Sequence, residues 1–425
     1  MEYFEIRGGN PLHGSVPVQG SKNSVLPLLA ASVLCRDGCE LENCPDISDV
    51  GAAIRILRHL GCKAAAAGGV VTVDAESVKR TDIPDGLMRE MRSSVIFLGA
   101  VLARCGEAEI YLPGGCRLGP RPIDMHLAAL ERLGAEIVTD GGKISCRAKR
   151  LRGAAVNFKS VSVGATENTM IAAATADGET VITNAAREPE IAELAAFLNA
   201  MGADIAGAGS NIIKIHGVSG LHGVRYRVMP DRIAGATILA AAAACGGSVE
   251  LGRCRPEHMT AVLDALHEMG CRIEPGTDSV RLSCGGLHAA RPVETDVYPG
   301  FPTDAQPLLM AASLKAEGTS VFVENIFESR FAHAAELRRM GGDIITSGRT
   351  AAVTGVRRLR GAQVEAGDLR GGAALMIAAL SADGASRIGG VEYINRGYDV
   401  PELTFAQLGA DIERKEADGA GKRKK

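Results

Sequence analysis

The sequence carries almost no excess charge of either sign. Its 425 residues include 47 Lys and Arg against 50 Asp and Glu, a formal net charge of −3. A chain without a global basic field lacks the electrostatic feature with which nucleic-acid and anionic-membrane binders attract their partners. A local basic end, Lys422 to Lys425, follows a Gly/Ala/Asp stretch, and we expect a solvated tail there from about residue 416.

Long hydrophobic runs are also lacking. The longest uncharged run, 233–249, has 17 residues dominated by Ala and Gly and is too short to cross a bilayer. The opening MEYFEIR has neither a basic segment nor an apolar one after it, so we expect no signal peptide. Because 46% of the residues are hydrophobic, the chain is expected to fold. We predict a cytoplasmic globular protein with no membrane or nucleic-acid partner.

Motifs for metals and common cofactors are missing as well. The 11 cysteines form no Cys-x-x-Cys pair, and the closest cluster, Cys35, Cys39 and Cys44, has no second pair to complete a zinc site. The segment GSVPVQGSK, residues 14–22, lacks the spacing of a P-loop, and no G-x-G-x-x-G opens a helix after a strand. We therefore predict no metal and no cofactor, and buried thiols in a reducing compartment.

What the sequence does contain is a repeat. The pattern apolar-x-x-apolar-Gly-x-x occurs six times, with its glycines 73, 68, 68, 71 and 68 residues apart. Such a period indicates six copies of one structural unit of about 70 residues. The six segments are LRHLGCK, LERLGAE, LNAMGAD, LHEMGCR, LRRMGGD and FAQLGAD.

Each unit also contains an Ala-rich apolar helix that ends at Gly and is followed by a strand, as in MIAAATADG before Thr180–Thr183. The helices are apolar on most faces, which predicts burial inside a covering of sheets. A second, longer repeat relates Leu12-His13-Gly14 to Leu221-His222-Gly223. We therefore predict two similar α/β domains of three units each, meeting near Pro230.

The starts of the first helices carry charges in equivalent places. Lys22, Arg92, Arg232 and Arg370 stand directly before buried apolar helices, where a cation opposes the positive end of the helix dipole. An anion bound between these cations and the helix ends would explain the pattern, and would create an anion-binding cleft. The alternative is a network of ion pairs between the domains.

Two further residues are candidates for chemistry. Cys116 lies in the glycine-rich segment LPGGCRLGPRPID between two arginines, which lower a thiol pKa and favour the reactive thiolate; the alternative is an accidental loop cysteine. Asp304 in FPTDAQP is a lone carboxylate that could act as a base, or simply cap a helix.

These motifs resemble those of the enolpyruvyl transferases, and within them the UDP-N-acetylglucosamine 1-carboxyvinyltransferases of peptidoglycan synthesis. The resemblance extends to about Glu413. It is carried by GSKNSVLP, MRSS, LPGGCRLGPRPIDMH, VGATEN, PDRI, FPTDAQP, IFESRF, DLRGGAAL and RGYD.

The resemblance implies two inverse α/β-barrel domains, each of three βαβαββ units. One enolpyruvyl-transferase domain would span residues 22–229 and include the Cys116 loop, and the second would combine 1–21 with 230–425. It also implies a transferase of the first committed step of peptidoglycan synthesis, and so of cell-wall biogenesis, cell shape and cell division. The substrates would be phosphoenolpyruvate and UDP-N-acetylglucosamine. The oligomeric state is left open.

Residue roles follow from the same resemblance. Cys116 would be the proton donor, would carry a covalent phosphoenolpyruvate adduct and would be alkylated by fosfomycin-type epoxides. Asp304, Lys22 and Arg396 would be the other catalytic residues. Phosphoenolpyruvate would be bound by Lys22, Asn23, Arg121, Arg370 and Arg396. The UDP-sugar would be bound by Arg92, Arg121, Pro122, Ile123, Asp124, Met125, Ser162, Val163, Asp304 and Ile326.

One position departs from the family pattern. Ser160 stands where family members commonly have Lys, and the adjacent Lys159 would point the other way if both lay in a strand. Three other interpretations remain. A transferase of the 5-enolpyruvylshikimate 3-phosphate type is disfavoured by Lys22-Asn23 and the Cys116 loop. A DNA-encircling clamp would need basic inner helices. A catalytically silent paralogue is the third.

Overall fold

The structure is a computed structural model that describes residues 2–112 and 123–416 of the chain. The described residues divide into two compact domains. The first domain comprises residues 20–112 and 123–229, and the second comprises residues 2–19 and 230–416. The chain passes from one domain to the other after Gln19 and again after Met229.

One sheet pattern occurs six times among the described residues. Each of the six sheets has four strands, with one parallel pair followed by two antiparallel pairings. In the sheet β10-β11-β13-β12, for example, β10 (Ala155–Asn157) runs parallel to β11 (Glu179–Thr183). β11 is antiparallel to β13 (Ile212–His216), which pairs in turn with β12 (Asp204–Ala206). A parallel pair needs a crossover, and α6 (Val163–Ala173) supplies it between β10 and β11.

Three units build the first domain. The first contains α1 (Lys22–Ala31), β3 (Gly38–Glu42), α2 (Ser48–Leu60), β4 (Lys63–Ala67) and β5 (Val70–Asp74), and β14 (Arg225–Arg227) completes its sheet. The second contains β6 (Asp82–Ile83), α3 (Asp85–Glu90), α4 (Phe97–Cys105), β7 (Glu107–Tyr111), α5 (Asp124–Arg132), β8 (Glu136–Asp140) and β9 (Lys143–Arg147). The third adds α6 (Val163–Ala173) and α7 (Pro189–Ala200) to β10–β13. Two 3₁₀ helices, Ser32–Leu34 and Arg92–Ile96, adjoin α1 and α4.

The second domain repeats the arrangement. Its first unit contains β2 (Leu12–Pro17), α8 (Arg232–Cys245), β15 (Gly247–Gly252), α9 (Thr260–Glu268), β16 (Arg272–Pro275) and β17 (Ser279–Cys284). Its second contains β19 (Val293–Glu294), α10 (Gln306–Ser313), β21 (Thr319–Val323), α11 (Ala334–Arg339), β22 (Asp343–Ser347) and β23 (Thr350–Thr354). Its third contains β24 (Gln363–Glu365), α12 (Leu369–Ser381), β25 (Ala385–Gly389), α13 (Val391–Ile394), α14 (Pro401–Gln407) and β26 (Asp411–Glu416). This domain also contains a small two-stranded sheet, β18 (Leu287–His288) with β20 (Ala316–Glu317). It has two 3₁₀ helices as well, Pro256–His258 and Arg330–His333.

The N-terminal strand closes the last sheet. β1 (Glu2–Arg7) lies between β25 and β26 and is antiparallel to both, with Phe4 opposite Ile388 on one side and Arg414 on the other. The first strand of the chain therefore completes the sixth unit, although more than 350 residues separate it from its neighbours.

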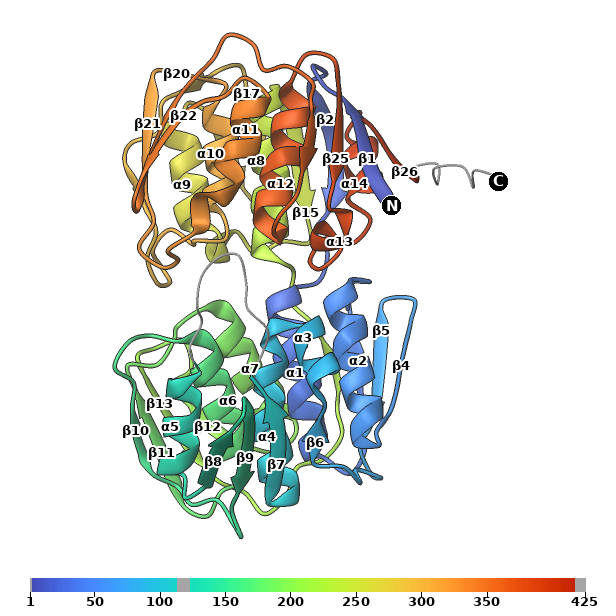
Figure 1. The fold of residues 1–425 in the computed structure, drawn as a ribbon, viewed down its shortest axis with the longest axis vertical. Coiled ribbons are helices and arrows are strands. Elements are labelled where there is room, and N and C mark those ends of the chain that lie inside the picture. The colour runs from blue at the N-terminus through green and yellow to red at the C-terminus, as the bar shows by residue number, and fades with distance from the viewer. Residues whose placement is uncertain (1, 113–122, 417–425) are drawn as a thin grey trace. The chain divides into compact units, whose positions relative to one another are not determined.

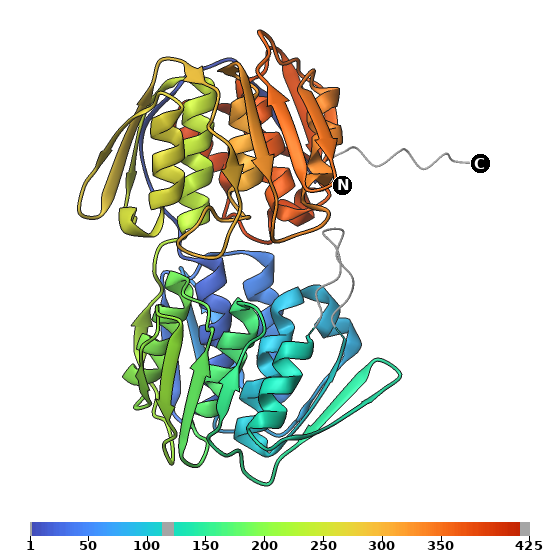
Figure 2. The same ribbon diagram turned by 90° about the vertical axis from the view of Figure 1, so that its left-hand side faces the viewer.

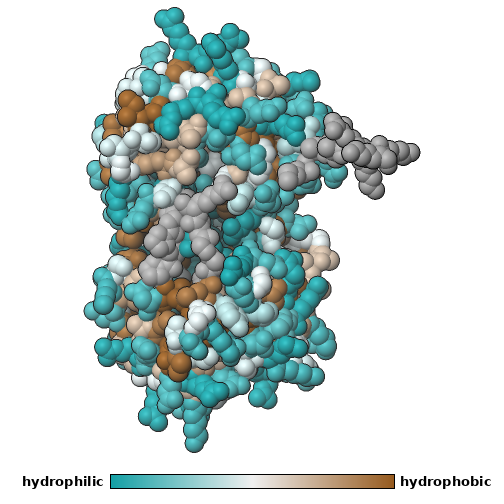
Figure 3. All heavy atoms as spheres, in the orientation of Figure 1, coloured by the Kyte–Doolittle hydropathy of each residue, from teal (hydrophilic) through white to brown (hydrophobic). Residues whose placement is uncertain are grey.

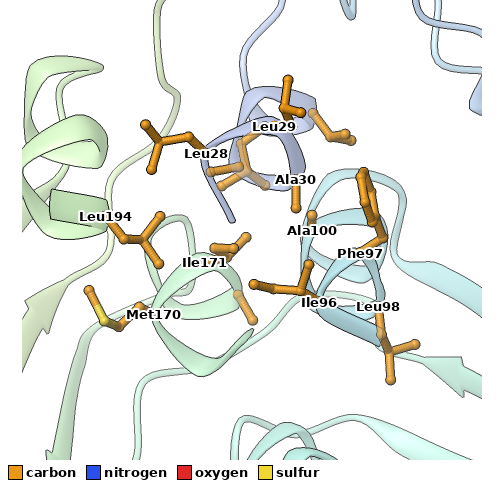
Figure 4. Packing of buried hydrophobic residues seen from close by; sticks show 14 of the residues in the cluster. Leu28, Leu29, Ala30, Ile96, Phe97, Leu98, Ala100, Met170, Ile171 and Leu194 are labelled. Carbon is orange, nitrogen blue, oxygen red and sulfur yellow. The ribbon is translucent and has the colours of Figure 1, made fainter. Parts of the chain in front are cut away.

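The apolar helices α1, α4 and α6 form the interior of the first domain and α8, α10 and α12 that of the second, and the sheets lie outside them (Figures 1 and 2). This follows from the sequence, because a helix that is apolar all round must be enclosed. In α8, every residue from Ile233 to Ala244 is buried. In the first domain, side chains of α1, α4, α6 and α7 such as Leu29, Phe97 and Ile171 pack into one core (Figure 4). The predicted inverse arrangement, with sheets outside helices, is confirmed.

The six repeat glycines share one role. Gly61, Gly134, Gly202, Gly270, Gly341 and Gly409 all have φ between 91° and 102°. This left-handed conformation ends a helix and is strained for residues that have a Cβ atom. The repeated glycine therefore stops the last helix of each unit, and the prediction of six similar units is confirmed.

Apolar side chains are scattered over the surface. Hydrophilic residues dominate the face in Figure 3, with small apolar areas between them. Within residues 2–112 and 123–416, we find no helix that is long and apolar enough to span a membrane.

Candidate active site

Helix starts position the predicted cations. Lys22 is the first residue of α1, where the hydroxyl of Ser21 accepts a hydrogen bond from Ser24 N at 3.3 Å. Arg232 is the first residue of α8, and Arg370 is the second of α12. Asp231 and Asp368 cap these two helices and supply a negative charge at the positive end of each dipole. A neighbouring acidic cap thus offsets the unfavourable placement of each arginine.

Lys22 has a carboxylate partner inside the first domain. Its Nζ lies 2.7 Å from Oδ2 of Asp49, a residue in the first turn of α2. The Lys22 and Asp49 side chains are only 11% and 2% exposed. Asn23, the next residue of α1, is half-buried. Asp49 was missed by the sequence reasoning, because nothing local marks it as the partner of a lysine 27 positions earlier.

Arg92 presents an unsatisfied buried donor. It begins the 3₁₀ helix Arg92–Ile96, and its Nη1 atom is buried without a hydrogen-bond partner among the residues that the structure describes. Leaving a buried charged donor unpaired is costly, so native proteins rarely do so. An anionic or carbonyl oxygen of a ligand would satisfy Nη1, and this favours a binding role for Arg92.

The other predicted UDP-sugar residues of the first domain lie at helix starts too. Ser162 caps α6, accepting a hydrogen bond from Ala165 N at 3.3 Å, and Val163 is the first residue of that helix. Asp124 is exposed and begins α5, Ile123 precedes it and is buried, and half-buried Met125 follows it.

Ser160 lies beside this group of residues. Its hydroxyl donates to Met125 Sδ at 3.6 Å. The expectation that Ser160 and Lys159 alternate along a strand is wrong, because β10 ends at Asn157 and both residues lie in a bend beyond it. Both side chains are exposed, so strand alternation does not prevent Lys159 from reaching the same region.

Asp304 is the centre of an ion-pair network in the second domain. Its Oδ1 accepts a hydrogen bond from Arg330 Nη2 at 2.8 Å. Its Oδ2 accepts two from Arg370, from Nε at 3.2 Å and from Nη2 at 3.1 Å. The N-cap interpretation of Asp304 is wrong, since α10 begins at Gln306 with Ala305 as its cap.

Both arginines are almost fully buried. The Arg330 guanidinium also donates to Thr303 O from Nε and Nη2, at 3.0 and 2.7 Å. Burial alone would lower the pKa of Arg370, but Tyr398, Asp304 and Asp231 together raise it above the usual value, so the guanidinium stays charged. A carboxylate held by two fixed cations has a fixed orientation, which a general base requires.

Ile326 is held near this network through Glu324. Ile326 is 38% exposed, and its backbone N donates to Glu324 Oε1 at 2.9 Å. The Thr303 hydroxyl donates to the same oxygen at 3.0 Å, next to Asp304 in the chain. Sequence reasoning missed Arg330 and Glu324, although Arg330 lies within the IFESRF segment that carries the resemblance.

The remaining predicted residues are placed only in part. Arg396 is half-buried in the turn after α13. Cys116, Arg121 and Pro122 lie outside the described residues, as does the predicted basic tail beyond Glu416. Among residues 2–112 and 123–416, no group of three or more His, Cys, Asp or Glu side chains could hold a metal ion.

Solved structures with this fold identify its class. The chain resembles the enolpyruvyl transferase NikO from Streptomyces tendae with a TM-score of 0.88 at 27% identity, covering 98% of this chain and 99% of the other. It resembles an EPSP synthase structure from Acinetobacter baumannii with a TM-score of 0.74 at 21% identity, covering 98% and 100%. The two-domain inverse barrel is therefore the enolpyruvyl transferase fold.

Sequence comparison narrows the class. The family model of EPSP synthase (3-phosphoshikimate 1-carboxyvinyltransferase) matches residues 6–402. UDP-N-acetylglucosamine 1-carboxyvinyltransferase 2 of Caldanaerobacter subterraneus subsp. tengcongensis is 47% identical over 97% of this chain and 100% of its own length. The protein of the same name from Bacillus subtilis is 44% identical over 97% of both chains. The chain belongs to the enolpyruvyl transferase family and, within it, groups with the UDP-N-acetylglucosamine 1-carboxyvinyltransferases, which confirms the predicted resemblance.

Proposed function

We propose that the chain transfers the enolpyruvyl group of phosphoenolpyruvate to the 3′-hydroxyl of UDP-N-acetylglucosamine and releases phosphate. This is the first committed step of peptidoglycan synthesis. The observation that carries the proposal is the 44–47% identity over 97% of the chain to relatives named for this reaction. The half-buried Asp304, held by the buried Arg330 and Arg370, supports it, because addition of a hydroxyl to an anionic enol ester needs a base beside fixed cations.

The reaction proceeds by addition and elimination. The sugar hydroxyl loses its proton to Asp304 and its oxygen bonds to C2 of phosphoenolpyruvate, while C3 gains a proton from Cys116. The resulting tetrahedral ketal then loses a proton from C3 and expels phosphate, which leaves an enol ether on the sugar. No atom changes oxidation state overall, so the chemistry calls for no redox cofactor. Cys116 is also the position at which a covalent phosphoenolpyruvate adduct would form.

Phosphoenolpyruvate is bound by four cationic side chains and one amide. These residues are Lys22, Asn23, Arg121, Arg370 and Arg396. Phosphoenolpyruvate carries a phosphate and a carboxylate, so its binding needs several fixed positive charges. Holding it in a fixed position beside the sugar hydroxyl supplies much of the increase in the reaction rate. The prior pairing of Lys22 with Asp49 supports its role, because Asp49 holds the ammonium in place before substrate arrives.

A second group of residues, which includes Arg92, binds UDP-N-acetylglucosamine. The buried Nη1 of Arg92, which has no hydrogen-bond partner among residues 2–112 and 123–416, supports a contact with an oxygen of this substrate. Ile123, Asp124, Met125, Ser162 and Val163 surround it, with Arg121 and Pro122 from the preceding segment. Asp304 and Ile326 complete the set of residues that bind this substrate. Both substrates are small soluble metabolites, and we place the reaction in the cytoplasm.

Phosphate release from phosphoenolpyruvate tests the proposal. The purified chain is incubated with UDP-N-acetylglucosamine or with shikimate 3-phosphate as the acceptor, and Asp304→Asn serves as the matched inactive control. Release with the UDP-sugar alone, reduced about 10²- to 10⁴-fold in Asp304→Asn, is the expected result. Release with shikimate 3-phosphate instead would favour the other enolpyruvyl transfer, and release with neither acceptor would indicate a silent paralogue.

A further inference from the structure

A chain of buried hydroxyl groups stands behind Arg370. The Nη1 of Arg370 donates to the Tyr398 hydroxyl oxygen at 3.2 Å, on the opposite side of the guanidinium from Asp304. The Tyr398 hydroxyl lies 2.8 Å from Thr237 Oγ1, and Thr237 Oγ1 lies 2.8 Å from Ile233 O. Tyr398 is 6% exposed and Thr237 is 1% exposed. Neither residue has a role in the reaction as proposed above.

The donors and acceptors in this series of hydrogen bonds can be assigned in only one way. A threonine hydroxyl has a single hydrogen, and that of Thr237 is donated to the carbonyl oxygen of Ile233. Thr237 Oγ1 must therefore accept from the Tyr398 hydroxyl, which leaves the Tyr398 oxygen to accept from Arg370. Each of the two hydroxyl groups then donates one hydrogen bond and accepts another. The series of hydrogen bonds ends at a backbone carbonyl of α8, an inner helix.

These hydroxyl groups hold the Arg370 guanidinium on the side that does not contact Asp304. Nε and Nη2 of Arg370 are held by Asp304, and Nη1 is held by Tyr398. The Arg370 Cζ also lies 5.6 Å from the centroid of the Tyr398 ring, within cation–π range. The three residues come from α12, from the turn after α13 and from α8, so three separate segments must be in place to fix one charge.

This second anchor matters when Asp304 takes up a proton. A neutral Asp304 carboxyl attracts the Arg370 guanidinium less strongly. Without another contact, the arginine side chain could then move toward other negative charges. Tyr398 is neutral, its pKa is raised by burial, and it holds Nη1 whatever the charge of Asp304. Tyr398 also lies two residues from Arg396, so the same hydroxyl chain restrains the segment that carries the second arginine.

We propose that Tyr398 and Thr237 are positioning residues for the reaction: they hold Arg370 toward phosphoenolpyruvate while Asp304 changes its charge. Because this rests on the proposed function, wild-type transfer activity is the first control. The main variants are Tyr398→Phe, which removes one hydroxyl, and Thr237→Val, which keeps the shape of the side chain and removes the acceptor. Thr237→Ser keeps the hydroxyl and should rescue activity.

Thr169→Val is the matched control. Thr169 is 1% exposed in α6 of the first domain, and its hydroxyl donates to Ala165 O at 2.7 Å, as that of Thr237 does to Ile233 O. A loss of activity caused only by removing a buried threonine hydroxyl from an inner helix would therefore appear in both valine variants. Steady-state kinetics for each substrate and urea denaturation of each variant separate the two cases.

In Tyr398→Phe and Thr237→Val, we expect kcat/KM for phosphoenolpyruvate to fall about 10- to 100-fold, the value of a hydrogen bond to a charged group. We expect KM for the UDP-sugar to change less than about two-fold, and Thr237→Ser and Thr169→Val to keep wild-type kinetics. Equal losses for both substrates, a loss in Thr169→Val, or no loss in either main variant would overturn the inference. A wild type without transfer activity would overturn the proposed function, and the positioning role with it.

Discussion

The buried Lys22–Asp49 pair gives a quantitative test of the first domain. Asp49→Asn preserves the shape of the side chain and removes its charge, leaving the Lys22 ammonium buried without the carboxylate that now lies 2.7 Å away. Removing one partner of a buried ion pair costs about 3–5 kcal/mol, because a desolvated charge remains. Asparagine still offers an oxygen to Lys22, so we expect the lower end, about 3 kcal/mol. For a domain of this size, that lowers the melting temperature by about 6–12 °C.

Urea denaturation of the full chain, followed by circular dichroism, measures the change in the free energy of unfolding. Calorimetry measures the change in the melting temperature. The double variant Lys22→Met/Asp49→Asn removes both charges of the pair and should recover much of the lost stability, since neither charge is then left without the other. Asp74→Asn is the control, because Asp74 pairs with Lys63 in the same domain but at the surface, where ion pairs contribute little. A loss below about 1 kcal/mol in Asp49→Asn, or a double variant no more stable than the single one, would refute the reasoning.

Three other predictions concern pH and nucleotide binding. Burial lowers the pKa of His126 to about 4, so the unfolded state binds a proton that the folded state does not, and stability should fall as pH drops from about 6.5 to 4. His126→Gln should flatten that pH dependence in urea titrations, and an unchanged slope would contradict it. Burial, with Glu190 and Glu188 nearby, raises the pKa of Glu167, so stability should fall as pH rises above about 4.3, where the unfolded carboxyl ionises. Glu167→Gln should therefore stabilise the chain at pH 8 and not at pH 4; equal effects at both values would count against a protonated Glu167. Ser160→Lys should lower KM for the UDP-sugar by up to about ten-fold and leave KM for phosphoenolpyruvate unchanged, and no change in either would show that Lys159 already fills the role.

The architecture could be predicted from sequence because its signals are local and repeated. Each unit carries its own helix period and its own glycine stop, and a glycine with positive φ can be anticipated within a single turn of chain. The placement of Lys22, Arg232 and Arg370 at helix starts followed from the same alignment of units. No tertiary information was needed for either.

The contacts of those charges could not be predicted, because they join distant segments. Asp304 and Arg370 form an ion pair although they lie 66 positions apart in the sequence. Tyr398, which accepts a hydrogen bond from Arg370, lies in an irregular segment whose sequence has neither a helix nor a strand period. The ion pairs of Lys22 and Arg370 with Asp49 and Asp304 lie within single domains, whereas the sequence had suggested either a bound anion or pairs between domains. Charge at a helix start indicates that a partner is needed and does not say which one.

The measurement that tests the central claim most directly is the structure of the product made from the UDP-sugar. The purified chain is incubated with phosphoenolpyruvate and UDP-N-acetylglucosamine, the nucleotide sugar is analysed by mass spectrometry and NMR, and inorganic phosphate is measured in the same sample. We predict one enolpyruvyl ether on the 3′-oxygen for each phosphate released. Phosphate without a modified sugar, or an enolpyruvyl group at another position, would contradict the proposed function.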